Sequence, residues 1–240
     1  EEIDNKIIFE NIFLDKDFKI IKIDKINLNY IDKDNKKNSI KLTRNKDTYN
    51  IFGKKFNADN LINKILNSEG NTNNLFKDDF DVNLKIDQIS LDNEDYLKNL
   101  KGNLNIKNNK VYSAKISSVF SNNKKFVLTI KSENNQKITN LFSEKAKPLV
   151  KRYKFIKGFE EGTLEFYSTK IDSNTSSSLK IFDFKLQELP VLTKLLTLAS
   201  LQGIADTLTG EGIRFNELEM NFSNQGNLMT IDELYAIGPA

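Results

Sequence analysis

Apolar and polar residues alternate along most of this chain, which is the pattern of β-strands that bury one face. The alternation is clearest in residues 80–87. Its apolar positions are Phe80, Val82, Leu84 and Ile86. Two further runs, 112–120 and 126–130, are separated by the polar residues 121–123, and this spacing predicts a hairpin with matched faces.

Shorter alternating runs predict additional strands. They lie at residues 40–42, 49–52, 100–106, 164–171 and 179–186. Between residues 18 and 30 the alternation changes phase, as it does where a β-bulge bends a long strand. Short polar turns separate the runs, and no helical pattern alternates with them regularly. The predicted fold is therefore mainly β, a long, curled and largely antiparallel sheet that forms a groove.

Three segments have helical spacing: 57–68, 141–153 with Pro148 inside it, and 190–208. The third is apolar nearly all round, so we expect it to be buried against the sheet or inserted among lipid chains. As a cap or plug of the groove it would contribute Leu192, Leu195, Leu196, Leu201 and Ile204. Lys194 and Asp206 interrupt its apolar run, which argues against a membrane span.

The composition removes most catalytic chemistry. Histidine and cysteine are both absent, which excludes the commonest general base, thiol nucleophiles and the usual zinc ligands. The 36 basic and 33 acidic residues nearly balance, which argues against nucleic acid as the main partner. The acidic residues of 92–95 are expected to form a solvated turn. A calcium loop beginning at Asp32 is rejected, because Lys37 replaces the required glycine and Thr43 the closing glutamate. No catalytic residue, metal site or cofactor is predicted.

Residues 181–240 contain several motifs in a definite order. They are Ile181-Phe182-Asp183-Phe184, Pro190-Val191-Leu192, Leu208-Thr209-Gly210-Glu211-Gly212-Ile213-Arg214-Phe215 and Gly238-Pro239-Ala240. This order resembles the AsmA-like C-terminal region of Gram-negative envelope proteins, in the branch that includes YhdP. The resemblance covers about residues 145–240. We therefore expect a β-rich, repeat-like groove segment over 1–142, with the short helix near 57–68, and an AsmA-like region over 143–240, truncated at its C-terminal end.

The resemblance implies a non-enzymatic periplasmic protein whose parent is anchored in the inner membrane. Its relatives form curled sheets with an apolar groove and are implicated in phospholipid transport between the inner and outer membranes, or in outer-membrane lipid homeostasis. The implied partners are phospholipid and, through parts of the parent outside this chain, the two membranes. The groove candidates are Phe80, Val82, Leu84, Ile86, Leu164 and Phe166.

Other interpretations remain open from the residues alone. Alternation by itself favours an ordinary sheet core with no ligand, because most inward apolar faces form core. A related possibility is a scaffold or assembly factor for outer-membrane proteins, as proposed for the TamB branch, in which an exposed sheet edge receives a client strand. An enzyme acting on envelope glycans would need a carboxylate pair in a cleft, and the sequence singles out no such pair.

Overall fold

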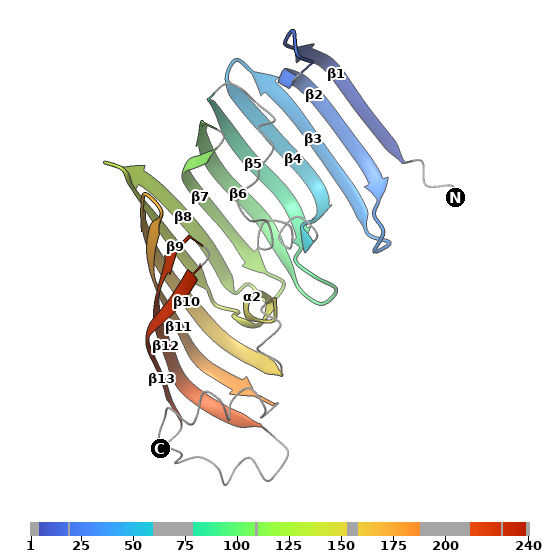
Figure 1. Ribbon diagram of the computed structural model, residues 1–240. Coiled ribbons are helices and arrows are strands. Elements are labelled where there is room, and N and C mark those ends of the chain that lie inside the picture. The colour runs from blue at the N-terminus through green and yellow to red at the C-terminus, as the bar shows by residue number, and fades with distance from the viewer. Residues whose placement is uncertain are drawn as a thin grey trace. The chain divides into compact units, whose positions relative to one another are not determined.

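A computed structural model describes residues 5–18, 20–59, 79–108, 110–152, 158–187, 212–226 and 228–238. In these residues the protein is mainly β, as predicted, with thirteen strands and one short helix (Figure 1). The chain divides into two compact units, Glu1–Asn123 and Lys124–Ala240.

The first unit is a sheet whose seven strands lie side by side in chain order. They are β1 (Lys6–Leu14), β2 (Ile20–Ile31), β3 (Lys37–Asn45), β4 (Thr48–Asn57), β5 (Phe80–Ser90), β6 (Tyr96–Lys107) and β7 (Lys110–Phe120). Neighbouring strands are antiparallel, with one exception. β4 and β5 are parallel, from the pair Thr48–Asp81 to the pair Asn57–Ser90. The predicted strands at 40–42, 49–52, 80–87 and 100–106 are confirmed, and each is longer than predicted.

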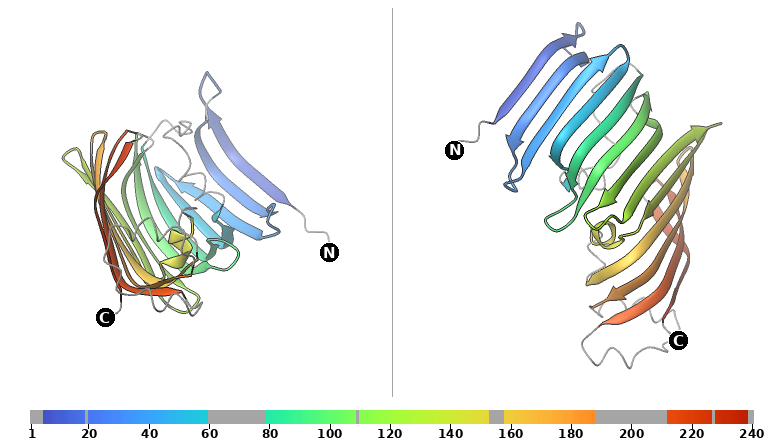
Figure 2. Two further views of the ribbon diagram at one scale, coloured as in Figure 1. Left: turned by 60° about the horizontal axis from the view of Figure 1, so that its bottom comes forward. Right: turned by 180° about the vertical axis from the view of Figure 1, so that it is seen from behind.

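The second unit contains six strands, again in chain order and all antiparallel within the unit. They are β8 (Lys125–Glu133), β9 (Gln136–Ser143), β10 (Phe159–Ile171), β11 (Asn174–Leu186), β12 (Ile213–Gln225) and β13 (Leu228–Ile237). The helix α2 (Lys147–Val150) lies between β9 and β10. The strands of this unit curve along their length, as Figure 2 shows from two sides.

The helix predicted over 141–153 is wrong in its first half. Leu141 lies in β9, where it pairs with Leu128 on one side and Phe166 on the other. The helical segment has only four residues, and Pro148 stands in its first turn, where its missing N–H is not needed. The other two predicted helices, 57–68 after Asp59 and 190–208 entirely, lie outside the described residues.

Four of the described strands, β1, β6, β10 and β11, are each interrupted by a non-glycine residue with positive φ. These residues are Asn11 (φ 54°), Asn99 (φ 53°), Glu161 (φ 63°) and Asp183 (φ 51°). Asn and Asp enter this left-handed region more easily than other side chains, because they can hydrogen-bond locally. At Asn99 and Asp183 the interruption places two buried residues three positions apart, Leu97 with Leu100 and Ile181 with Phe184. Such interruptions bend the strand and increase its twist.

The second unit has a well-packed core between its sheet and α2. Phe184 is 1% exposed, and its ring is stacked at 5.3 Å from Phe159 and 5.1 Å from Phe215. Ala146 and Val150 contribute from the helical segment to the same buried cluster. The short helix is therefore held by tertiary packing, since four residues cannot form a stable helix alone.

We expect Gly162→Ala to destabilise this core by about 1–3 kcal/mol. Gly162 has a φ of +82°, and an added Cβ would lie 3.0 Å from Phe184 Cβ and 3.3 Å from Ala146 Cβ. Chemical unfolding of Gly162→Ala and of a control variant measures the change in the free energy of unfolding. Gly226→Ala is the matched control, because its φ is +58° but no atom lies within 4 Å of the added Cβ. Equal losses in the two variants would show that backbone strain alone, and not packing, determines the effect.

Candidate functional site

Rows of paired apolar residues cross the strands of the first unit on one side of the sheet. The first apolar row is Phe9, Ile26, Leu42, Ile51, Leu84, Gly102 and Ile116. The second apolar row is Ile7, Leu28, Ile40, Gly53, Ile86 and Leu100. Directly paired residues on adjacent strands point to the same side of a sheet. The two rows together define what we call the apolar face of the first unit.

The two glycines in these rows do not break the apolar surface. A Cβ added at Gly53 would lie 2.4 Å from Ile40 Cδ1, and one added at Gly102 would lie 2.9 Å from Ile116 Cγ1. Isoleucine side chains from the neighbouring strands therefore lie over both glycine positions. The glycines allow this close approach, which any larger residue would prevent.

The opposite side of the same sheet is mostly polar, although Ile8 and Phe52 also lie there. Asn103 Nδ2 donates to Asn83 Oδ1 at 2.7 Å, and Asn83 Nδ2 donates to Asn50 Oδ1 at 2.9 Å. Asn105 Nδ2 donates to Asp81 Oδ1 at 2.8 Å. These side-chain amides form a hydrogen-bonded ladder across the strands, and the ladder is exposed to solvent. The first unit thus has two chemically different faces.

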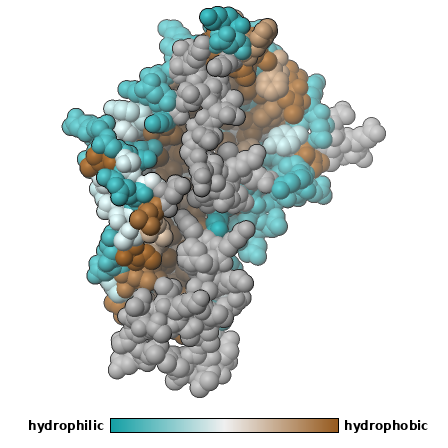
Figure 3. All heavy atoms as spheres, in the orientation of Figure 1, coloured by the Kyte–Doolittle hydropathy of each residue, from teal (hydrophilic) through white to brown (hydrophobic). Residues whose placement is uncertain are grey.

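The second unit repeats this arrangement. Its first apolar row is Leu128, Leu141, Phe166, Leu179, Met220 and Leu234. Its second row is Phe126, Ser143, Leu164, Ile181, Leu218 and Ala236. We call this surface the apolar face of the second unit, and α2 packs on part of it through Ala146 and Val150. Figure 3 shows hydrophobic atoms of each unit on the side turned to the viewer, with hydrophilic atoms beside them.

The predicted groove residues all lie on these faces, but with different surroundings. On β5, Val82 and Ile86 are 9% and 6% exposed, whereas Phe80 and Leu84 are half-buried. The Phe80 ring meets Tyr49 edge-on at 5.2 Å.

The two candidates on β10 differ in the same way. Leu164 is 5% exposed and belongs to the core beneath α2, so side chains of the chain itself cover it. Phe166 is partly buried at the margin of that core. The plug candidates Leu192, Leu195, Leu196, Leu201 and Ile204 lie outside the described residues.

Most members of the rows were not singled out from the sequence. The register between strands selects them, and no single strand contains that information. Gly53 and Gly102 offered a signal, because a glycine within an alternating strand often marks a close approach of neighbouring groups.

An ion pair lies at one margin of the apolar face of the first unit. Arg44 follows Leu42 by two residues on β3, so it shares that face, and it pairs with Tyr49 of β4. Its Nη1 lies 3.5 Å from Asp24 Oδ1, and its Nη2 lies 3.5 Å from Asp47 Oδ1. Asn11 Nδ2 donates to Asp24 Oδ2 at 3.3 Å. The Arg44 side chain is only 19% exposed.

The other ends of the first-unit strands carry a polar network around Asp32. Its carboxylate accepts hydrogen bonds from the N–H groups of Lys36 and Asp34 and from the amides of Asn38 and Asn57, the last at 2.7 Å. Burial raises the pKa of Asp32, but these hydrogen bonds together hold that pKa below its ordinary value. The network joins the turn between β2 and β3 to the end of β4, which is a structural role.

The acidic residues of 92–95 form a turn, as predicted, but it is not solvated throughout, because Asp95 is 5% exposed. Asp92 Oδ1 accepts the N–H groups of Glu94 and Asp95, each at 2.7 Å. Across the described ranges, no group of three or more His, Cys, Asp or Glu side chains could hold a metal ion.

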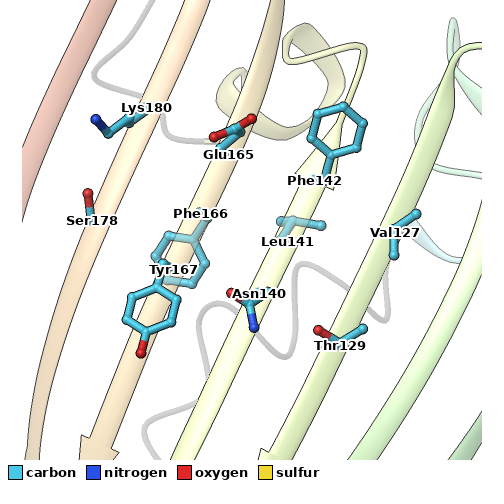
Figure 4. A pocket seen from close by; sticks show the side chains of 10 residues that line it. All are labelled: Val127, Thr129, Asn140, Leu141, Phe142, Glu165, Phe166, Tyr167, Ser178 and Lys180. Atoms are coloured by element: carbon cyan, nitrogen blue, oxygen red, sulfur yellow. The ribbon is translucent and has the colours of Figure 1, made fainter.

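A shallow pocket lies on the side of the second unit opposite its apolar face (Figure 4). Two neighbouring rows line most of it: Val127, Phe142, Glu165 and Lys180, and Thr129, Asn140, Tyr167 and Ser178. Lys180 Nζ is engaged by Glu219 Oε2 at 2.7 Å. In Figure 4 α2 is seen behind the sheet, so this pocket and the apolar face of the second unit lie on opposite sides.

Acid should weaken the second unit through Glu219. The carboxylate accepts hydrogen bonds from Lys180 at 2.7 Å, Tyr235 at 2.6 Å and Asn221 at 3.3 Å, and these hold the pKa of Glu219 below its ordinary value, Lys180 most of all. A carboxyl with a lowered folded-state pKa stabilises the fold above its ordinary pKa, and this contribution is lost as the pH falls through the folded value. We expect the unfolding midpoint to decrease on acidification, and Glu219→Gln to flatten that decrease. Glu165→Gln on the same side is the control, and an equal flattening there would contradict the assignment.

Comparisons with protein-family models, with curated proteins and with solved structures find no match for this chain. Within the described ranges, no helix is long and apolar enough to cross a membrane.

Proposed function

We propose that this chain is part of an AsmA-like periplasmic protein, anchored in the inner membrane by its parent, which moves phospholipid between the inner and outer membranes without catalysing a reaction. The observation that carries the proposal is the pair of apolar rows on the first unit. The longer row has an apolar residue or glycine on each of the seven strands. The opposite side of the sheet carries mostly polar residues, among them the hydrogen-bonded Asn50, Asn83 and Asn103.

Such a row has dimensions that suit an acyl chain. Adjacent strands lie about 4.8 Å apart, so a row across seven strands extends about 29 Å. The chains of one bilayer leaflet span about 15 Å, half of the hydrocarbon core. Each methylene removed from water contributes about 0.8 kcal/mol, so a continuous apolar row can hold a chain along its whole length.

Several residues of the apolar rows are only half-buried, which favours a bound ligand and argues against a closed protein core. Ile26, Leu42, Ile51 and Leu84 are neither buried nor fully exposed. Residues of a finished core would be buried almost completely. Side chains at this intermediate exposure leave apolar surface that a lipid chain would cover.

The test is extraction of the purified full chain followed by mass spectrometry of the extract, together with transfer of a fluorescent phospholipid between two vesicle populations. We expect phospholipid in the extract in at least equimolar amount, and faster transfer in the presence of the protein. A protein free of lipid that also fails to accelerate transfer would overturn the proposal.

A second candidate function, assembly of outer-membrane proteins, is favoured by one feature of β1. Among the described strands β1 pairs only with β2, and its Ile7, Phe9 and Ile12 are 56%, 50% and 46% exposed. An unpaired apolar edge can receive a client strand by β-augmentation. Phe13 also lies on β1 and is 41% exposed, so a photoreactive residue in its place distinguishes the two functions. Protein adducts would favour assembly, and lipid adducts would favour transport.

A further inference from the structure

We infer that Asp24 and Arg44 form a head-group site for a zwitterionic aminophospholipid at the margin of the apolar face of the first unit. Arg44 would bind the phosphate, and Asp24 would bind the ammonium group. This inference rests on the proposed function and adds to it the class of lipid and the place where its polar end is held.

The position of the pair suits a head group. Arg44 shares the side of β3 that carries Leu42 and Ile40 and lies next to the end of the strand at Asn45. Two residues along a strand correspond to about 7 Å. A phosphate at Arg44 would therefore leave the attached chains at the first apolar row, while the head group stays at the end of the strands, where Asp47 is 84% exposed to water.

The geometry of the ion pairs leaves Arg44 able to bind an additional anion. Both of its ion-pair distances are 3.5 Å, longer than the 2.7–2.9 Å of a charge-assisted hydrogen bond. A guanidinium has five N–H donors in a planar fork that matches phosphate oxygens. A cation that is 19% exposed beside apolar rows is costly unless it is paired well, and a phosphate would improve its pairing.

The surrounding charges favour a zwitterion over an anionic lipid. Two carboxylates, Asp24 and Asp47, pair with one guanidinium, so these three groups together carry a net negative charge without ligand. A lipid with a phosphate and no compensating cation would bring another negative charge close to Asp24. An ammonium group on the same lipid would instead pair with Asp24, whose side chain is 36% exposed and accessible.

The experiment measures head-group preference and chain binding separately on the full chain. Vesicles of phosphatidylethanolamine, phosphatidylglycerol and phosphatidylcholine supply the lipids, and a fluorescent fatty acid reports occupation of the apolar rows. For Arg44→Gln we expect phosphatidylethanolamine uptake to fall about tenfold, the effect of one charge-assisted hydrogen bond, with fatty-acid binding unchanged. For Asp24→Asn we expect the preference to move from phosphatidylethanolamine toward phosphatidylglycerol.

Arg44→Lys serves as the charge-retaining control and should keep more uptake than Arg44→Gln, and thermal unfolding confirms that each variant is folded. If the unmodified protein takes up phospholipid but neither substitution alters the head-group preference, the head-group site is wrong and lipid transport stands. If the unmodified protein takes up neither phospholipid nor fatty acid, the proposed function itself is wrong.

Discussion

Phe184→Ala should destabilise the second unit by about 3–5 kcal/mol, the largest stability effect expected in the described residues. Phe184 is 1% exposed and lies between the rings of Phe159 and Phe215, with interplanar angles of 12° and 10°. Its removal would leave a cavity lined by both rings and by Ala146, and it would also remove two aromatic contacts. Urea unfolding followed by circular dichroism measures the change.

Tyr167→Ala is the matched control for this prediction. Tyr167 is also a large aromatic residue of the second unit, but it lies on the side opposite the apolar face and is 46% exposed. We expect it to change the free energy of unfolding by about 1 kcal/mol or less. Similar losses for Tyr167→Ala and Phe184→Ala would mean that the stacked core does not determine the stability of the unit.

The strands of this protein were predictable because apolar and polar side chains alternate along them, as expected when one face of a sheet is buried. Phe80 to Asp87 alternates without a break, and the structure places the whole run in β5. The same holds for 164–171 in β10, whereas 179–186 lies wholly in β11 but changes phase at Asp183. In β5 and in this part of β10 one face lies against apolar neighbours and the other meets water, and this difference between the faces produces the period of 2.

Two features of the fold were not predicted, and each has a physical reason. Leu141, Phe142, Leu149 and Val150 have helical spacing, but β9 gains cross-strand pairs on both sides as far as Ser143 and continues as a strand. The sequence analysis predicted a largely antiparallel sheet and did not single out the parallel pair of β4 and β5. Its signal was the 22 residues between Asn57 and Phe80, since antiparallel neighbours are joined by short turns and parallel ones need a long connection.

The left-handed residues illustrate a rule that alternation alone misses. In Leu97-Lys98-Asn99-Leu100 and Ile181-Phe182-Asp183-Phe184, an Asn or Asp with positive φ precedes the second apolar residue, and both apolar residues are buried. A strict period of 2 assigns these apolar residues to opposite faces. An Asn or Asp in this position of a strand pattern therefore indicates an interruption rather than the end of the strand.

An apolar face was predictable from the sequence, but most of the residues that form it were not. Leu84 and Ile86 were identified because they alternate, whereas Ile51 and Leu42 join them only through the register of β3, β4 and β5. The pairing of Arg44 with Asp24 depends on the same register. A single charged residue in an alternating strand does not indicate which residue of another strand it pairs with. The Arg44–Asp24 ion pair could therefore not be predicted from the sequence.

Leu84→Glu should abolish most lipid uptake, the largest functional effect expected. Leu84 lies near the middle of the first apolar row, between Ile51 and Gly102, and is half-buried. A carboxylate there would have to lose its water against an acyl chain, at a cost of several kcal/mol. A lipid that avoided it would leave roughly half of the row unused, at about 0.8 kcal/mol for each methylene returned to water. We expect phospholipid per protein to fall about tenfold or more, measured by mass spectrometry of extracts.

Lys85→Glu tests whether the effect belongs to the face or to the added charge. Lys85 is the next residue of β5 and is exposed on the opposite side, among the residues that include Lys54 and Asp87. Lys85→Glu introduces the same carboxylate one position away from Leu84. An effect of folding or of net charge should therefore appear in both variants. Uptake retained in Lys85→Glu and lost in Leu84→Glu would place the lipid on the apolar rows. Uptake retained in both would remove the rows from the transport path, because no lipid chain can cross a charged Leu84 position while remaining in contact with Ile51 and Ile116 on either side.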